Sequence, residues 1–115
     1  MEINKTEIGN TEDREKFLFN KAFDHLPLGQ FMYLPMSMLH PITIDDYKDS
    51  HTDGPLEVFR KGEKIFIDDG NHRYFTKQRD LIKESGSKEP DYNKVMMKII
   101  KVDPKKAINS WMLDH

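Results

Sequence analysis

Residues 65–78 read IFIDDGNHRYFTKQ, and the character of this stretch changes at Gly70. The residues before the glycine, Ile65–Ile67, are β-branched and aromatic, which predicts a buried strand. Residues 71–83 after it carry apolar side chains at helical spacing, which predicts an amphipathic helix. A strand, a glycine turn and a helix start direct backbone N–H groups toward one place, where an anion can bind.

The four residues at this junction are candidate phosphate ligands. Gly70 permits close approach of the backbone to a ligand, and the amide of Asn71 can form hydrogen bonds. His72 can donate to phosphate or transfer a proton, because its unperturbed pKa lies near 6.5. Arg73 offers a planar fork that suits two phosphate oxygens. We therefore expect Gly70, Asn71, His72 and Arg73 to bind phosphate, with His72 also a candidate catalytic residue.

Two aspartates precede the glycine and allow several interpretations. Asp68 and Asp69 are candidate ligands for a Mg²⁺ ion that bridges phosphate oxygens, because hard cations prefer carboxylates. Alternatively, Asp69 orients His72 or Arg73 and so supports catalysis. A third interpretation is structural, since aspartates commonly accept hydrogen bonds from backbone N–H groups in turns.

Length and composition narrow the class of protein. The chain has 115 residues, of which 37% are hydrophobic and 33% charged, and its net charge is −2. This predicts one domain over residues 11–115, preceded by a disordered tail over residues 1–10. Apolar runs are too short to span a bilayer and no signal pattern is present, so we expect a cytoplasmic protein without membrane contact. The absence of cysteine excludes disulfides, thiolate catalysis and cysteine-ligated metals.

The remaining segments predict helices and short strands. We expect a helix over residues 11–26, an edge strand and extended segment over residues 30–39, and a short helix over residues 43–50. Residues 56–59 and 64–67 flank a turn containing Gly62 and predict a β-hairpin. Residues 95–102 predict a last strand, and residues 107–113 a short final segment in which Trp111 and Leu113 dock on the body.

This order of segments resembles the ParB/sulfiredoxin superfamily over residues 30–103. The most specific likeness is Gly-Asn-His-Arg-Tyr at residues 70–74, which is similar to Gly-Cys-His-Arg-Tyr in sulfiredoxin. ParB proteins have a Gly-Glu-x-Arg-Arg type of loop there, and free-serine kinases of the superfamily have Asp-Gly-His loops. The resemblance implies an α+β fold, a small single domain with a mixed β-sheet and packed helices. It also implies that the loop holds nucleotide phosphates.

The resemblance extends to individual residues but excludes one activity. Asn71 occupies the position of the sulfiredoxin cysteine and cannot form sulfur intermediates, so sulfiredoxin chemistry is excluded. His72 and Arg73 match the phosphate-binding histidine and arginine of the superfamily. Glu57, on the strand that precedes the hairpin turn, is a candidate general base in the manner of the kinase branch.

Three functions follow as alternatives. The first is a nucleotide- or phosphate-binding domain, acting as a phosphotransferase or nucleotide hydrolase on ATP, ADP or CTP with Mg²⁺. The second is a ParB-like nuclease or DNA-binding accessory protein, for which basic side chains in the C-terminal half provide a nucleic-acid surface: Lys77, Arg79, Lys83, Lys94, Lys98 and Lys101. The third is a non-catalytic interaction module whose Phe/Met-rich residues 17–39 bind a host protein or form a homodimer. The sequence does not decide between an enzyme and a binder.

Overall fold

The computed structural model of the chain describes residues 11–42 and 54–107. Its elements follow in the order α1 (Thr11–His25), β1 (Phe31–Pro35), the 3-10 helix η1 (Met36–Met38), β2 (Leu39–Pro41), β3 (Leu56–Lys61), β4 (Lys64–Asp69), α2 (Asn71–Ser85) and β5 (Met96–Lys101). The predicted tail at residues 1–10, the short helix at residues 43–50 and the docking of Trp111 and Leu113 lie outside the described residues.

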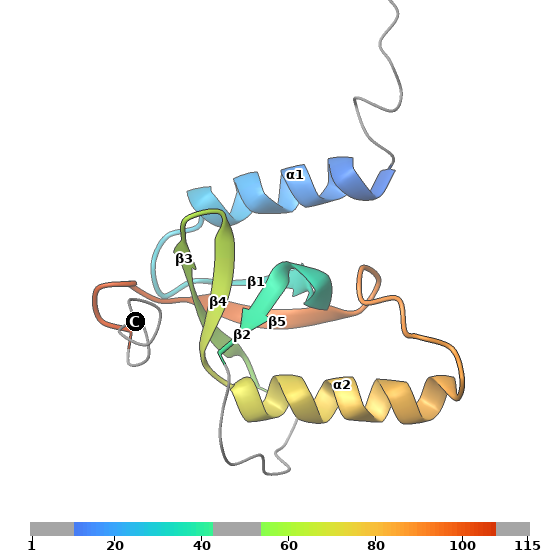
Figure 1. Cartoon of the computed structure of the whole chain (residues 1–115). Coiled ribbons are helices and arrows are strands. Elements are labelled where there is room, and N and C mark those ends of the chain that lie inside the picture. Colours follow the sequence, from blue (N-terminus) through green and yellow to red (C-terminus); the bar gives the residue numbers. More distant parts are fainter. Residues whose placement is uncertain (1–10, 43–53, 108–115) are drawn as a thin grey trace, which may run out of the picture.

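The five strands form one mixed sheet in the order β1-β5-β3-β4-β2. The β3–β4 hairpin and the β1–β5 pair are antiparallel, whereas β3–β5 and β2–β4 are parallel. The sheet is curled, and α1 and α2 lie at opposite ends of the molecule in the view of Figure 1. The predicted α+β class with a mixed sheet and packed helices is therefore confirmed.

One buried cluster joins the inner face of the sheet to both helices. Its members are Phe23, Leu34, Met36, Met38, Leu39, Leu56, Val58, Ile65, Ile67, Tyr74, Met97 and Ile99. Leu56, Val58, Ile67 and Ile99 come from the three central strands and are fully buried. These β-branched and aliphatic residues suit strands that are covered on the inner face.

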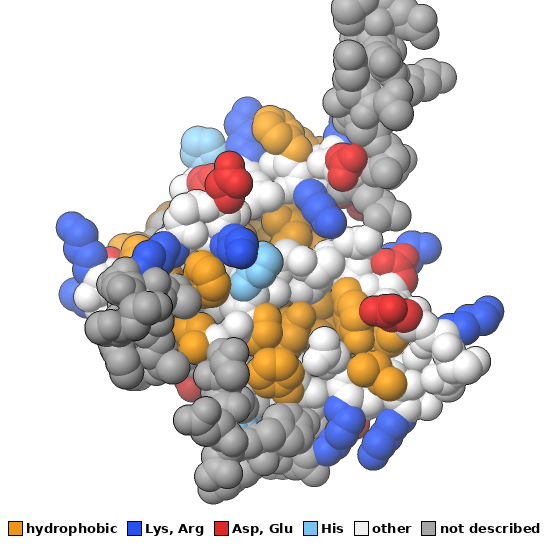
Figure 2. Space-filling model, in the orientation of Figure 1, with side chains coloured by type: hydrophobic (Ala, Val, Ile, Leu, Met, Phe, Trp, Pro, Cys, Tyr) orange, Lys and Arg blue, Asp and Glu red, His pale blue; other side chains and the backbone are white. Residues whose placement is uncertain are grey.

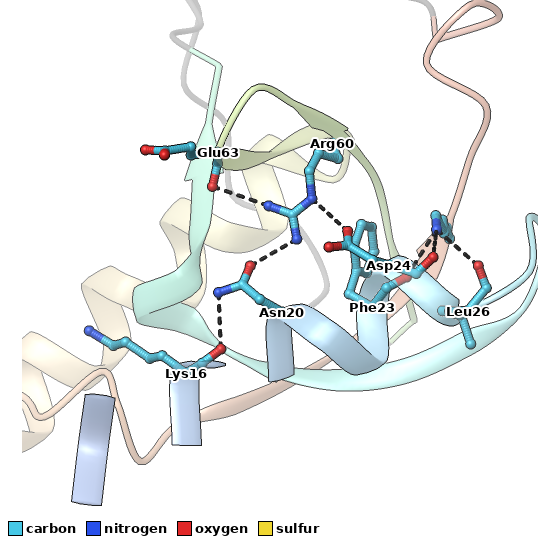
Figure 3. Close-up of polar contacts among 8 residues, drawn as sticks. Lys16, Asn20, Phe23, Asp24, Leu26, Arg60 and Glu63 are labelled. Atoms are coloured by element: carbon cyan, nitrogen blue, oxygen red, sulfur yellow. Dashed lines mark hydrogen bonds and ion pairs between the residues drawn. The ribbon is translucent and has the colours of Figure 1, made fainter. Parts of the chain in front are cut away.

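Arg60 on β3 holds α1 against the sheet (Figure 3). Its Nε donates to Asp24 Oδ1 at 2.7 Å and its Nη2 donates to Asn20 Oδ1 at 2.8 Å. Its guanidinium also lies 5.6 Å from the centre of the buried Phe23 ring. Lys101 also holds the C-terminal end of α1, because its Nζ donates to the carbonyl oxygens of Phe23 and Leu26, each at 2.9 Å. Such carbonyls at a helix C-terminus lack partners within the helix.

The segment after β1 differs from the predicted extended chain. Pro35 is followed by one 3-10 turn, and the chain then forms the three-residue strand β2, which pairs in parallel with β4. The turn is stabilised locally, since the N–H of Met36 donates to Val95 O at 2.8 Å and that of Ser37 to Tyr92 O at 3.2 Å. The chain thus leaves one edge of the sheet and returns at the opposite edge.

Candidate functional site at the start of helix α2

Gly70 has a conformation and a location that require glycine. It is the N-cap of α2, with φ 108° and ψ 13°, in the left-handed region. A Cβ at this position would lie 2.5 Å from Leu56 Cδ2 and 3.0 Å from Arg73 Nη2. The predicted strand–glycine–helix junction is therefore present, and it is tightly packed. Tyr74 N donates to Gly70 O at 2.9 Å, which closes the first turn of the helix.

The Arg73 side chain folds back over this turn. Its Nη2 lies 3.6 Å from Asp69 Oδ2, which is within ion-pair distance but too long for a good hydrogen bond. Its Nη1 would lie 3.4 Å from a Cβ at Gly54, so the guanidinium passes close to two glycines. The side chain is 23% exposed. Arg73 thus lies at the surface of the junction, with charge available to an anion.

Asn71 is part of the framework of the junction. The residue is buried, its Oδ1 accepts from the backbone N of Ile42 at 2.7 Å, and its Nδ2 donates to Ile67 O at 3.0 Å. The sequence predicts this side chain as a phosphate ligand. The structure instead engages both ends of the amide in internal hydrogen bonds that join α2 to β4 and to the chain after β2.

His72 and Arg73 leave the first turn of α2 in different directions. Successive side chains of an α-helix project about 100° apart, because one turn contains 3.6 residues. His72 is half-buried and shares a side of the helix with Phe75 and Arg79, at spacings of three and seven residues. Arg73 faces the glycine turn instead. A ligand that contacts both side chains must therefore cover the end of the helix.

An acidic pair lies beside Arg73 at the end of the hairpin. Glu57 on β3 pairs in register with Asp69 on β4, next to an irregularity between Glu57 and Val58. The pKa of Glu57 is raised above its ordinary value, first by burial, then by the charge of Asp69 and a side-chain hydrogen bond to it, and by Asp68. Arg73 acts in the opposite direction and favours the ionised form. A glutamate with a raised pKa beside a second carboxyl group is an arrangement suited to proton transfer.

Asp68 and Asp69 do not face the same environment. Asp68 is 3% exposed, whereas the side chain of Asp69 is 58% exposed. Consecutive residues of a strand point to opposite faces, yet both carboxylates act on the pKa of Glu57. Within residues 11–42 and 54–107, no group of three or more His, Asp or Glu side chains is arranged to hold a metal ion. Asp69, next to Glu57 and Arg73, is the aspartate that a ligand can reach.

A groove of about 360 Å³ lies along α2, lined by Phe75, Gln78, Arg79, Ile82 and Lys83. Figure 2 shows hydrophobic side chains gathered between η1 and α2 on the face in view, with Lys and Arg side chains around them. The surface of the groove is almost entirely apolar, although Arg79 and Lys83 contribute to its lining, so it suits a flat or apolar group of a ligand. The sequence predicts an amphipathic helix here but not the groove.

The basic residues of the C-terminal half serve different parts of the molecule. Lys101 binds the carbonyl end of α1, and Lys98 Nζ lies 4.8 Å from the Phe31 ring centre on the β1–β5 sheet. Lys94 lies 3.9 Å from Asp91, in an exposed ion pair. Arg79 and Lys83 line the α2 groove. These positions span the sheet, a loop and α2.

The sequence analysis also missed Gly54, which lies against Arg73. Its φ of 106° is in the left-handed region, and the sequence alone does not indicate its contact with α2. An Asp-Gly pair indicates a turn but not its tertiary partner.

The chain matches no protein-family model, no curated protein and no solved structure. None of the helices in the described segments is long and apolar enough to cross a membrane.

Proposed function

We propose that this chain is a cytoplasmic nucleotide- or phosphate-binding domain of the ParB/sulfiredoxin type, with its ligand at the junction of β4 and α2. The observation that carries the proposal is the position of Arg73, whose guanidinium lies over the glycine turn, 3.6 Å from Asp69 Oδ2. A phosphate oxygen offers this guanidinium shorter and better aligned bonds than Asp69 does. The positive end of the α2 dipole favours the same charge.

The groove along α2 provides a place for the base of a nucleotide. His72 lies in the first turn, Phe75 follows nearly one turn later on the same side of the helix, and Gln78 lines the groove three residues further on. With a rise of about 1.5 Å per residue, residues 72 and 78 are about 9 Å apart along the axis, which is comparable to the length of a nucleoside monophosphate. Phosphates at the helix end therefore allow the base to reach Phe75. This favours ATP, ADP or CTP over free phosphate.

The acidic pair supports a phosphotransferase or nucleotide hydrolase activity. Glu57 holds a proton more tightly than an ordinary glutamate and is hydrogen-bonded to Asp69. In the proposed reaction, ionised Glu57 accepts the proton of an attacking water or hydroxyl group as its oxygen bonds to the terminal phosphorus and the bond from that phosphorus to the leaving nucleotide phosphate breaks, while Arg73 stabilises charge on the phosphoryl oxygens. Mg²⁺ commonly uses one or two protein carboxylates together with substrate phosphates, and Asp69 is the residue that would hold it.

Isothermal calorimetry with ATP, ADP and CTP, each with Mg²⁺, tests the proposal. We expect at least one nucleotide to bind, and Arg73→Gln to weaken its binding by about tenfold or more, as for loss of a charge-assisted hydrogen bond. Arg14→Gln removes the same charge from an exposed position on α1 and should leave binding unchanged. Absence of binding, or equal effects of the two substitutions, would contradict the proposal.

A non-catalytic interaction role is the alternative that an observation favours. Several large apolar side chains outside the core are exposed, among them Phe17 at 63% and Tyr33 at 56%. Tyr33 lies on an edge strand of the sheet. Unchanged binding of all three nucleotides by Arg73→Gln, together with specific self-association, would favour this role.

A further inference from the structure

Strand β1 is a regular edge strand. It pairs with β5 along its whole length, from Phe31 opposite Ile100 to Pro35 opposite Met96, without a bulge. No strand in the described part of the chain lies beyond it. Phe31 and Tyr33 remain 49% and 56% exposed. This edge therefore presents both a backbone ladder and two aromatic rings.

The hydrogen-bond register shows which backbone groups face outward. Met36 N donates to Val95 O, and Lys101 N donates to Gln30 O, which identifies hydrogen-bonded pairs at both ends of the β1–β5 ladder. Hydrogen-bonded pairs recur at every second residue of an antiparallel ladder. Met32 and Leu34 therefore bond to β5. The N–H and C=O groups of Phe31 and Tyr33 point away from the sheet.

The two edges of the sheet differ in how they are protected. Both edge strands end in a proline, but β2 has only three residues, and such short edges resist pairing. β1 has five residues, no charged residue and no bulge, and its one proline is its last residue. Natural proteins commonly blunt exposed edges with charge, bulges or short strands. β1 has none of these three features, which indicates an edge that pairs with another strand.

We propose that β1 pairs in antiparallel register with β1 of a second copy of this chain, about a twofold axis next to Met32. In this register Phe31 of each copy lies opposite Tyr33 of the other copy, which gives two Phe31–Tyr33 pairs. Within each pair, the two residues form two backbone hydrogen bonds with each other. All outward N–H and C=O groups of the two aromatic residues are then satisfied. A register centred on Tyr33 places Phe31 opposite the partner's Pro35, which has no N–H to donate, so the proline selects the Met32 register.

The side chains are also self-complementary in this arrangement. Residues directly opposite in a ladder share a face, so each Phe31 ring contacts a Tyr33 ring of the other copy. Aromatic cross-strand pairs are among the favourable ones in sheets. Lys98 already lies 4.8 Å from the centre of the Phe31 ring and covers its open side. A second copy therefore satisfies the backbone and covers the exposed rings of both chains at once, as an isologous interface requires.

Light scattering of the full chain from about 1 µM to about 1 mM is the first test, a range chosen to cover weak self-association. We expect a dimer whose fraction rises with protein concentration. Tyr33→Lys should weaken it by at least tenfold, whereas Phe17→Lys, on exposed α1, should leave it unchanged. A monomer throughout, or a dimer that tolerates Tyr33→Lys but not Phe17→Lys, would overturn the proposal. Circular dichroism verifies that both variants are folded.

Single cysteines test the register without depending on the stability of these variants, because the chain contains no cysteine. Across the proposed axis, the two copies of residue 32 form a non-hydrogen-bonded pair with Cα atoms about 4.5 Å apart, within disulfide reach. The two copies of residue 33 are diagonal neighbours about 7–8 Å apart. Under an added oxidant, Met32→Cys should form the covalent dimer faster than Tyr33→Cys. The reverse order, or no covalent dimer from either, would overturn the assignment.

Discussion

Asn71 Oδ1 accepts a 2.7 Å hydrogen bond from the backbone N–H of Ile42. These residues are far apart in sequence, and the bond joins the start of α2 to the chain leaving β2. The other end of the same amide bonds to Ile67 O, so one side chain connects three segments around the candidate site. The shape of the candidate site therefore depends on the internal hydrogen bonds of Asn71.

Asn71→Ala should destabilise the fold by about 2–4 kcal/mol, because it leaves a buried N–H and a buried C=O unsatisfied. Asn71→Asp should cost at least as much, since it removes the donor to Ile67 O and adds charge in a buried position. Urea denaturation measures both changes. Gln30→Ala, at an exposed position, is the control. A change below about 1 kcal/mol for Asn71→Ala would contradict the structural role.

Gly70→Ala should be more disruptive than the same substitution at another left-handed glycine. Both Gly70 and Gly29 have positive φ, but an added Cβ meets Leu56 at 2.5 Å only at Gly70, with nothing within 4 Å at Gly29. We expect about 3 kcal/mol or more at Gly70 and about 1 kcal/mol at Gly29, where only backbone strain applies. Thermal unfolding of the two variants gives the comparison. Equal losses would show that packing at Gly70 is not limiting.

Arg60→Gln should loosen α1 from the sheet. It removes hydrogen bonds from the guanidinium to Asp24 and Asn20, and the cation–π contact with Phe23. Because the pair with Asp24 is partly exposed, we expect a loss of about 2 kcal/mol. Hydrogen exchange should increase mainly in Thr11–His25. Equal acceleration across α2 would indicate global rather than local loosening.

Glu57→Gln should stabilise the folded protein at neutral pH. The pKa of Glu57 is raised in the folded state by burial and by Asp69, so its protonated form is favoured there. Stability from this group is therefore present at acidic pH and falls as pH rises through the folded-state pKa. The gain in stability of Glu57→Gln over the unsubstituted protein, measured by thermal unfolding, should be larger at pH 7 than at pH 4. An advantage that shrinks with rising pH would contradict this sign.

Local patterns in the sequence were sufficient to predict much of the fold. The hairpin with Gly62 in its turn, the helix over Thr11–His25 and the last strand are confirmed. Each has a strong local signal, either helical spacing or short apolar runs beside a turn. The strand–glycine–helix junction at Gly70 is confirmed for the same reason.

The parts that sequence could not predict depend on distant contacts. The three-residue strand β2 exists because it pairs with β4, and its own sequence of Leu-His-Pro gives no strand signal. The internal role of Asn71 depends on Ile42, and the contact of Arg73 with Gly54 depends on how the loop returns. A polar residue at a helix start gives no indication of whether it will face a ligand or the interior.

The most direct measurement is an amide NMR titration of the folded chain with ATP, ADP, CTP and inorganic phosphate. Binding at the junction should shift the amide signals of residues 70–73 first, and those of Phe75 and Gln78 when the ligand carries a base. Arg73→Gln should suppress these shifts, while Arg14→Gln preserves them. If the shifts are absent, or arise only in residues remote from the start of α2, phosphate binding at this junction is contradicted.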